Sequence, residues 1–528
     1  MSNAPLILPP PPAADRASLT TWIAISAAMI GAFMAILNIQ ITNASLLNIE
    51  GGIGTGIDNG SWISTSYLIG EIIVIPLTDY LSRVFSFRIY MLASAILFPV
   101  FSIACAFTHE LGSMIAMRGL QGFAGGVLIP MAFTLVLTKL SRAQQPIGLA
   151  LFAVAVTFAP AIGPTIGGYL TENYGWQAIF FVNAVPSAVM VIALFFTLER
   201  RPMQLGLLWQ GDWLGIATMA IGLSALQAVL EEGNKDDWFA SPFILRLAIV
   251  AAVSLSLFVW IELRIAQPLI RLRLLTQRNF GFGTISVVLV GFALFGSVYI
   301  LPAYLGQVQH YNAEQIGKVM AWTGLPQLLL IPLVPRLMRR FDPRHIAFVG
   351  ISIFAASCFM NTAMSVDYAG DQLFIPNVVR AVGQALVLTP LTSVGLGSIA
   401  PADAAAASGI SNMLRNLGGA VGTAVLATII TKREQFHSNI IGQSVTMERG
   451  EVRDRLAALS RYFAAHGVAD PAAASHQAVI ALGNSVRQQA LVMGFSDTFA
   501  VIGVVLGLAA AAILLTRKSR PGRAAVAH

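Results

Sequence analysis

Four ionisable side chains lie inside long apolar segments of this sequence, where a charge is costly and usually has a function. One is a carboxylate, Glu71, and three are guanidinium groups, Arg118, Arg380 and Arg415. A carboxylate in a partly dry cavity can take up a proton and release it again. A fixed cation beside it can expel that proton when the two groups approach each other. These four residues therefore predict chemistry in which protons and charges move.

Each of the four residues shares a helical face with polar residues, since side chains three, four or seven positions apart point the same way. The neighbours are Ser64, Tyr67 and Thr78 for Glu71, Gln121 for Arg118, Asn377 and Gln384 for Arg380, and Ser408 and Asn412 for Arg415. Such faces predict a polar cavity, and two central arginines favour anionic or zwitterionic ligands. Structural roles stay open. Glu71 can lock the packing, Arg118 can bond backbone carbonyls, and the other arginines can extend to a helix end.

The composition places these residues in a membrane protein. The chain has 528 residues, of which 56% are hydrophobic and 11% charged, and its mean hydropathy is +0.73. A membrane helix needs about 20 consecutive apolar residues. Runs of this kind predict about fourteen spans, near 20–43, 60–80, 88–107, 111–138, 146–170, 176–197, 212–231, 243–264, 280–305, 315–335, 345–364, 373–398, 404–430 and 494–516.

The distribution of basic residues predicts the orientation. If the spans alternate in direction, most Lys and Arg of the short loops lie on one side, so both termini are expected in the cytoplasm. The net charge of +7 then reflects topology, and no nucleic-acid partner is indicated. Cys105 and Cys358 fall within spans, so we expect neither a structural disulfide nor a metal site.

Residues 159–168 read Ala-Pro-Ala-Ile-Gly-Pro-Thr-Ile-Gly-Gly. Ala159, Gly163 and Gly167 form a stripe of small residues that admits another helix at close range. The segment resembles the antiporter motif GxxxGPxxGG on the fifth helix of major facilitator superfamily exporters, with Ala159 in place of the first glycine and with Pro164 and Gly168 matching. We expect Pro164 to bend this helix and the stripe to close against a helix of the carboxyl-terminal half.

The order of spans and motifs extends this resemblance to nearly the whole chain. Six spans fill residues 1–200, two fill 201–275 and six fill 276–528. Arg118–Gly122 on the fourth span and Trp176–Asn183 at the sixth complete the pattern of the fourteen-helix drug:proton antiporters, the EmrB/QacA type. The resemblance implies an all-α integral membrane protein with two six-helix bundles and two extra helices.

The two halves of the chain also repeat weakly, as parallel repeats do. The residues that correspond are Arg118, Gln121 and Pro130 with Asn377, Arg380 and Pro390, and the glycines of the fifth span with Gly418, Gly419 and Gly422.

Two positions depart from the family pattern. Related transporters carry an Asp on the first helix where this chain has Asn38, which cannot titrate. Asn38 can still bond with Thr42 and Ser45, and Glu71 is expected to take over proton coupling together with Arg118. In the loop after the second span, Arg83 occupies a position that is usually an aspartate, so the salt-bridge pattern of that gate is in question.

Polar and aromatic residues within spans predict the substrate cavity. Aromatic rings can form an adaptable apolar wall, although most aromatic residues in spans serve packing or interfacial anchoring. The residues expected to bind substrate are Asn38, Thr42, Tyr67, Gln121, Phe158, Tyr299, Arg380, Gln384, Asn412 and Arg415.

Residues 433–493 form a long polar segment that the topology places in the periplasm. Met447–Ala465 predicts an amphipathic helix with Val452, Leu456, Leu459 and Phe463 on one side, and Asp470 with Pro471 predicts the start of another helix. Similar exporters of Gram-negative bacteria work with a periplasmic adaptor and an outer-membrane channel, so we expect the apolar side to dock an adaptor. The alternative is a mobile, solvated loop.

The resemblance implies efflux of amphipathic drugs and toxic compounds across the inner membrane by alternating access. The proton gradient would supply the energy, with no cofactor and no enzymatic reaction. The sequence has no phosphate-binding loop of the form GxxxxGK[ST], which argues against an ATP-driven pump. Two other readings stay open, namely an exporter of a single organic acid or secreted metabolite and a membrane scaffold or sensor that transports nothing.

Overall fold

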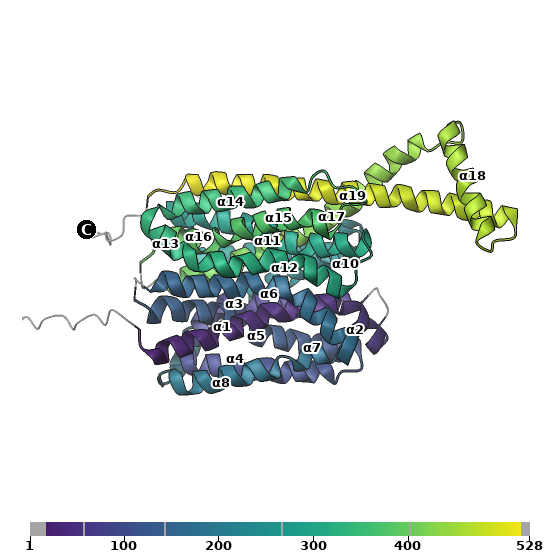
Figure 1. Ribbon diagram of the computed structural model, residues 1–528. Helices are drawn as coiled ribbons and strands as arrows, with labels where there is room; N and C mark the ends of the chain where they lie inside the picture. The colour runs from purple at the N-terminus through teal and green to yellow at the C-terminus, as the bar shows by residue number, and fades with distance from the viewer. Residues whose placement is uncertain (1–16, 56–58, 142–143, 266–267, 401–402, 519–528) are drawn as a thin grey trace, which may run out of the picture.

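The computed structural model describes residues 17–55, 59–141, 144–265, 268–400 and 403–518, and these residues form helices without any strand. The helices run side by side in one elongated bundle (Figure 1). The beginning of α1 and the end of α19 lie at the same end of the bundle, and a helical arm projects from the opposite end. All-helical architecture is expected in lipid, because each backbone polar group must find its partner within the chain.

Eight helices form the N-terminal bundle. Their bounds are α1 Leu19–Ala44, α2 Leu46–Ile53, α3 Ser61–Val84, α4 Phe87–Ala106, α5 Leu111–Lys139, α6 Gln145–Tyr174, α7 Ala178–Phe181 and α8 Ala184–Thr197. One cluster of buried apolar side chains comes almost entirely from these helices.

A linking segment follows, with η1 Leu205–Gln210, α9 Trp213–Glu232, η2 Trp238–Ala240, α10 Pro242–Arg264 and η3 Leu272–Thr276. Helices α9 and α10 pack against each other, and α9 also contacts α3 and α17. A smaller apolar cluster joins α3, α9, α10 and α17, so the linking pair is in contact with both halves of the molecule.

The C-terminal bundle contains the remaining elements, which are α11 Arg278–Gln307, α12 Ala313–Leu330, η4 Ile331–Leu333, α13 Val334–Arg340, α14 Pro343–Met360, α15 Gly370–Ala385, α16 Leu388–Leu396, α17 Ala404–Ser444, α18 Gly450–Ala465 and α19 Pro471–Leu514. A second large apolar cluster lies within α11 to α19.

The number of spans agrees with the prediction. Among the described residues, thirteen helices are long and apolar enough to cross a membrane, and α6 supplies a fourteenth when its two parts are taken as one bent span. The two parts, Ile147–Pro160 and Ile162–Tyr174, meet at 45°. Pro164 has no N–H to bond the carbonyl of Pro160 one turn earlier, and its ring crowds that carbonyl. Pro164 therefore accounts for the bend of α6 between Pro160 and Ile162, about one turn before the proline.

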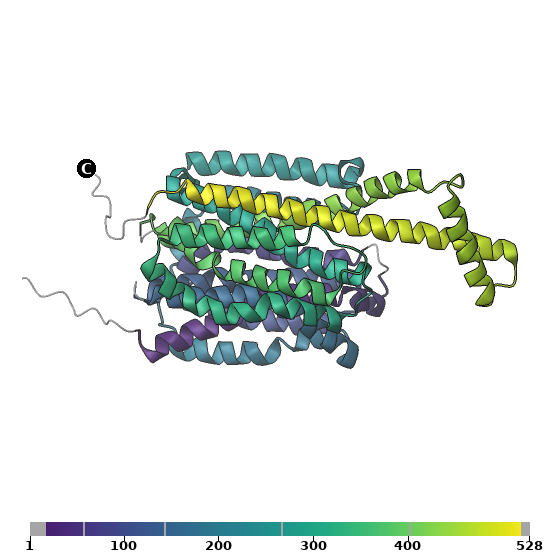
Figure 2. The ribbon, with the colours of Figure 1, turned by 45° about the horizontal axis from the view of Figure 1, so that its top comes forward.

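The segment 433–493 was expected to be a long polar loop that contains two helices, and it is largely helical. Helix α17 continues through Ser444 and α19 begins at Pro471, and α18 connects them at the tip of the arm (Figures 1 and 2). Hydropathy falls where the chain leaves the apolar region, but no proline or other breaker ends either helix there. The amphipathic helix and the Asp470 cap are confirmed, since the Asp470 carboxylate accepts hydrogen bonds from the N–H groups of Ala472 and Ala473.

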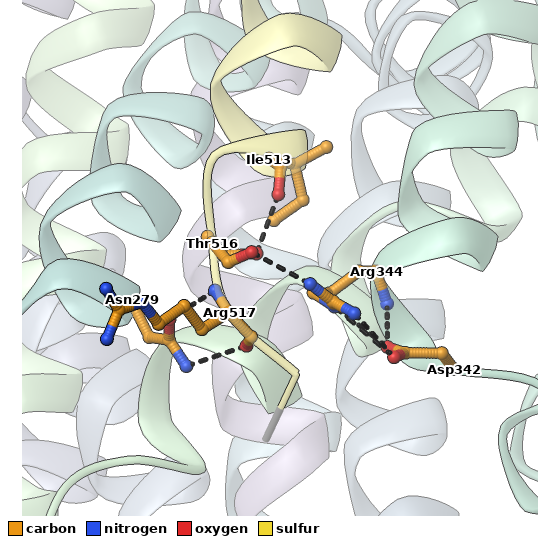
Figure 3. A network of polar contacts seen from close by, with 6 residues as sticks. All are labelled: Asn279, Asp342, Arg344, Ile513, Thr516 and Arg517. Atoms are coloured by element: carbon orange, nitrogen blue, oxygen red, sulfur yellow. Dashed lines mark hydrogen bonds and ion pairs between the residues drawn. The ribbon is translucent and has the colours of Figure 1, made fainter.

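At the end of the bundle opposite the arm, polar contacts tie the chain after α19 to two other helices (Figure 3). Asn279 of α11 exchanges two hydrogen bonds with the backbone of Arg517, at 2.7 and 3.0 Å. Arg344 of α14 donates to the carbonyl of Thr516 at 2.8 Å while its guanidinium pairs with Asp342 at 3.0 Å. Arg344 thus bonds a carbonyl that the end of α19 leaves without a helical partner.

Candidate functional site

Arg118 lies at the centre of the N-terminal bundle and is completely buried. Its guanidinium donates to the side-chain oxygen of Asn38 on α1, to that of Gln121 at 2.8 Å, and to the carbonyl of Ile63 at 3.2 Å. The ring of Tyr67 lies 4.4 Å from the guanidinium carbon. The acceptors around this cation are therefore neutral amides and a carbonyl, with an aromatic face beside them.

The position of Tyr67 depends on close contact between α3 and α5. Gly122 lies against the backbone of Tyr67, and Gly126 lies one turn further along against the backbone of Glu71. Side chains at these two glycines would separate the helices. The hydroxyl of Tyr67 donates to the carbonyl of Ala35 on α1 at 2.9 Å, so α1, α3 and α5 meet at one point.

Glu71 is buried on α3 and faces the C-terminal bundle. The amide of Asn416 on α17 donates to Glu71 Oε1 at 3.2 Å, and Glu71 Oε2 has no partner within the described residues. Arg415, the preceding residue of α17, is also buried. The structure contains no ion pair between Glu71 and Arg118. Glu71 and Arg118, the two residues predicted to couple protons, are therefore not in direct contact.

Arg415 and Asn412 of α17, two of the residues expected to bind substrate, line a cavity between the two bundles. Phe133 of α5 and Phe152 of α6 line it from the N-terminal side, and Ser408 lies beside the two predicted residues on α17. Arg415 Nε and the Ser408 hydroxyl have no hydrogen-bond partner among the described residues. Polar groups line one wall and aromatic rings the other, an arrangement suited to an amphipathic ligand.

A second cavity lies at the bend of α6 and contains the other predicted pair, Arg380 and Gln384 of α15. Pro160 lines it from the N-terminal bundle, and Ser297 of α11 and Thr323 of α12 line it from the C-terminal bundle. Hydroxyl hydrogens of both Ser297 and Thr323 are used within their own helices. Donors facing this cavity therefore come from α15.

The small-residue stripe of α6 contacts a different helix from the one expected. Gly163 lies against Gln40, and Gly167 lies against Ile41, so both glycines pack on α1 within the N-terminal bundle. The stripe is therefore part of a packing contact inside one bundle. Thr165, on the next face of α6, makes a contact between the bundles, because it lies against Gly317 of α12.

The C-terminal bundle repeats this packing. Gly418 and Gly422 of α17 lie against the backbone of Val288 and Phe292 on α11. The fifth long helix of each bundle thus packs through glycines on the first, which agrees with the predicted parallel repeat.

Other predicted binding residues are placed as follows. Ala159, Pro164 and Gly168 are buried in α6. Thr42 is buried, but its hydroxyl donates to the carbonyl of Asn38 at 2.8 Å. That bond occupies the donor within α1.

Two predicted aromatic residues differ in exposure. Phe158 stacks on Phe33 with ring centroids 6.4 Å apart. Tyr299 is 44% exposed on α11, so it is not part of an enclosed wall.

Sequence reasoning did not find the acidic contact at the arm end of the bundle. Glu232, the last residue of α9, is almost completely buried and accepts hydrogen bonds at 2.7 Å from Ser61 and Thr65 of α3. In the next turn of chain, Trp238 donates to Thr428 of α17 at 3.0 Å. We call residues 233–241 the outer strap, because with Glu232 they connect α3 to α17. Because Glu232 is the last residue of a span, nothing in the sequence indicated that its side chain is buried.

The described part of the chain contains no candidate metal site. No group of three or more His, Cys, Asp or Glu side chains is placed to hold a metal ion there. Cys105 and Cys358 are both buried and free.

Comparisons with known proteins identify the relatives of the chain. The model of the Major Facilitator Superfamily matches residues 28–423. The colistin resistance protein EmrB of Acinetobacter baumannii is 32% identical over 487 residues, which cover 92% of this chain and 94% of that protein. The multidrug export protein EmrB of Escherichia coli K12 is 32% identical over 426 residues, covering 79% and 81%.

The fold is also found among solved structures. The proton:xylose symporter XylE bound to 6-bromo-6-deoxy-D-glucose aligns with a TM-score of 0.59 at 13% identity, over 94% of this chain and 95% of that one. At this identity the likeness shows a common fold.

Proposed function

The chain belongs to the major facilitator superfamily and is a multi-pass transporter of the EmrB multidrug-exporter type, and from this premise we propose that protons drive its efflux cycle. The substrates are amphipathic toxic compounds, and the two bundles move against each other to open the cavities alternately to the two sides. The two relatives named above are described as resistance and multidrug export proteins, which supports this substrate class.

The observation that carries the proposal is the buried contact of Glu71 with Asn416. The carboxylate is on α3 of one bundle and its hydrogen-bond donor is on α17 of the other. An ionised Glu71 accepts strongly from Asn416 and is attracted by Arg415, so it holds the bundles together at this point. A protonated Glu71 loses the attraction to Arg415 and is a weaker acceptor. Loading and release of one proton therefore change how firmly the two bundles are held.

Arg118 has a positioning role in this mechanism. Its guanidinium orders Asn38, Gln121 and the ring of Tyr67, and Tyr67 precedes Glu71 by one helical turn on the same face. Asn38 replaces the titratable residue of related transporters with a neutral acceptor. We therefore assign proton exchange to Glu71, the buried carboxylate that bonds across the two bundles.

Transport in reconstituted vesicles tests the assignment. Glu71→Gln keeps the size and the hydrogen-bonding capacity of the side chain and removes its charge. We expect this variant to insert normally and to lose efflux driven by an imposed pH gradient. The matched control is Glu314→Gln, because Glu314 is 54% exposed in an ion pair with Lys318. Full gradient-driven efflux by Glu71→Gln would show that the proton is carried elsewhere.

We further propose that the arm delivers substrate into a tripartite assembly in the inner membrane of a Gram-negative cell, with a periplasmic adaptor and an outer-membrane channel. Both ends of the described chain would then lie on the cytoplasmic side, opposite the arm. The apolar side of α18 is half-buried because α18 packs along α19. The docking surface is therefore the outside of the arm, which exposes Tyr462 and Val479.

Deletion of residues 440–480 tests the arm. Efflux from vesicles should persist, whereas resistance of cells and co-purification of the adaptor should be lost. The double substitution of Tyr462→Ser and Val479→Ser leaves the arm in place and should weaken the same co-purification. Intact cellular resistance after the deletion would rule out docking through the arm.

A dedicated exporter of one organic acid is the second candidate, and the uncompensated charge of Arg380 in its cavity favours it. A resistance profile separates the two proposals. Protection against chemically unlike drugs supports multidrug efflux, and protection against one class of acid supports the dedicated exporter.

A further inference from the structure

We propose that Arg380 and Gln384 form a head-group site for amphipathic organic anions, with a carboxylate as the recognised group. The inference rests on the proposed function, since it names a substrate class for the same transporter. The proposed site is distinct from the cavity at Arg415, because Arg380 and Gln384 line a different cavity.

The guanidinium of Arg380 is a buried cation without an ion-pair partner among the described residues. Its side chain is 1% exposed, and it makes no hydrogen bond among the described residues. The ring of Phe499, 5.6 Å from the guanidinium carbon, is its aromatic neighbour. A buried charge without acceptors costs several kcal/mol in a membrane interior. The fold retains that cost at a residue that lines a cavity.

The two halves of the molecule show what Arg380 lacks. Asn38 is the twentieth residue of α1, and its side-chain oxygen accepts from Arg118. Ser297 is the twentieth residue of α11 and lines the cavity that contains Arg380. Its shorter side chain bonds to the carbonyl of Leu294 at 3.0 Å and does not accept from the arginine. The position of Asn38 is thus occupied in the C-terminal half by a small side chain that offers Arg380 no acceptor.

Gln384 supplies a second donor at the same place. Its side-chain oxygen accepts from Gln327 at 2.8 Å, which fixes the amide orientation. The nitrogen of that amide is left without an acceptor among the described residues. Arg380 precedes Gln384 by four residues, so both donors lie on one face of α15. A planar guanidinium fork with an adjacent amide donor suits a carboxylate, which accepts two or more hydrogen bonds.

The rest of the cavity wall indicates an amphipathic ligand. Leu294, Val298 and Met320 line it from the C-terminal bundle, and Pro160 lines it at the bend of α6. The cavity measures only about 10 Å³ in this conformation, so a ligand enters when the bundles move apart, and its apolar body then lies against these side chains while its charged end meets Arg380. Since Pro160 belongs to the other bundle, movement of the bundles changes this wall and can release the ligand.

The charges within the transport core agree with an anion. Arg118, Arg380 and Arg415 are all buried, and Glu71 is the carboxylate in contact with this region. Binding of a carboxylate at Arg380 reduces the excess positive charge, whereas binding of a cation there increases it. The structure therefore discriminates between ligands by charge at this cavity.

Equilibrium binding to the purified full-length protein tests the proposal with two probes, 4-phenylbutanoate and 4-phenylbutanamide. The probes share their size and apolar body and differ in charge. Wild-type protein should bind the carboxylate more tightly than the amide. Arg380→Gln should weaken carboxylate binding about tenfold or more, the usual effect of losing a charge-assisted pair, and should change amide binding less than about twofold.

A second variant keeps the test independent of folding. Gln384→Glu preserves the shape of the side chain and its bond with Gln327, and places a carboxylate beside Arg380. It should abolish the preference for the carboxylate probe as fully as Arg380→Gln does. Arg380→Lys retains a cation and should retain part of the preference. Arg487→Gln, which removes an exposed arginine of the arm, is the control and should change neither dissociation constant.

Three outcomes would overturn the site. These are equal affinity of wild-type protein for the two probes, unchanged carboxylate binding in Arg380→Gln, and an equal loss for both probes in that variant. If one of these three outcomes is found while wild-type vesicles show gradient-driven efflux, the site fails and the proposed function stands. Loss of all efflux in wild-type vesicles would instead refute the proposed function, whatever the binding result.

Discussion

The contact of Gly126 with α3 allows a test of how helix packing positions Glu71, the proposed proton site. A methyl group built at Gly126 would lie 2.9 Å from the Cα and 3.0 Å from the carbonyl oxygen of Glu71. Ordinary contacts of this kind begin at 3.4 Å. Gly126→Ala therefore requires α3 to move by about 0.5 Å at Glu71, because a backbone cannot rotate away as a side chain can.

The energetic cost follows from two opposing terms. Overpacking costs about 1–3 kcal/mol, and alanine favours the helix over glycine by about 1 kcal/mol. Gly507→Ala supplies the second term alone, because a methyl group at Gly507 on α19 meets nothing within 4 Å. The difference between the two variants in free energy of unfolding should thus be about 1–3 kcal/mol, with Gly126→Ala the less stable.

Unfolding of the purified protein by SDS titration measures that difference, and vesicle transport measures its consequence. Displacement of Glu71 relative to Asn416 should reduce the coupling of efflux to the pH gradient in Gly126→Ala and leave Gly507→Ala unaffected. Equal stability of the two variants together with full coupling would refute the argument that this glycine positions Glu71.

Three further predictions concern other contacts. Although partial burial opposes its ionisation, hydrogen bonds and the charge of Arg344 hold the pKa of Asp342 below its ordinary value. Asp342→Asn should therefore lower stability by about 1 kcal/mol at neutral pH, and thermal unfolding curves of variant and wild type should converge as the pH falls through that depressed pKa. Asp470→Ala removes an N-cap worth about 1 kcal/mol, and faster hydrogen exchange in the first turns of α19 should reveal the loss, whereas unchanged exchange would contradict it. Trp238→Phe removes the bond to Thr428, and spin labels on α3 and α17 should report a wider distance distribution if the outer strap restrains the bundles.

Sequence reasoning located the charged residues because a charge within an apolar run stands out without knowledge of the fold. Glu71, Arg118, Arg380 and Arg415 were found in this way, and all four are buried. Their partners could not be found by the same means. Asn416 is 345 residues away from Glu71, and an amide on a helix face does not reveal which other helix it meets.

The arm and the stripe show two other limits. Hydropathy gives the apolar length of a helix, and α17 and α19 continue as helices after that length ends. The spacing of Gly163 and Gly167 correctly predicted close contact with another helix. The spacing does not indicate which helix that is, and the structure shows that it is α1. Two helices of one bundle and two helices of different bundles use the same small-residue pattern.

The continuity of α19 has a mechanical consequence. From Pro471 to Gly494, where the apolar part begins, the helix rises about 35 Å at about 1.5 Å per residue. An unbroken helix of this length acts as a lever whose other end lies among the helices of the C-terminal bundle. A tilt of that bundle by about 10°, the order of rigid-body rotations in switching proteins, would sweep the tip through about 6 Å. A protein that grips the tip would therefore feel each tilt as a displacement wider than the spacing between neighbouring residues, and a grip firm enough to hold the tip still would also hold the bundle.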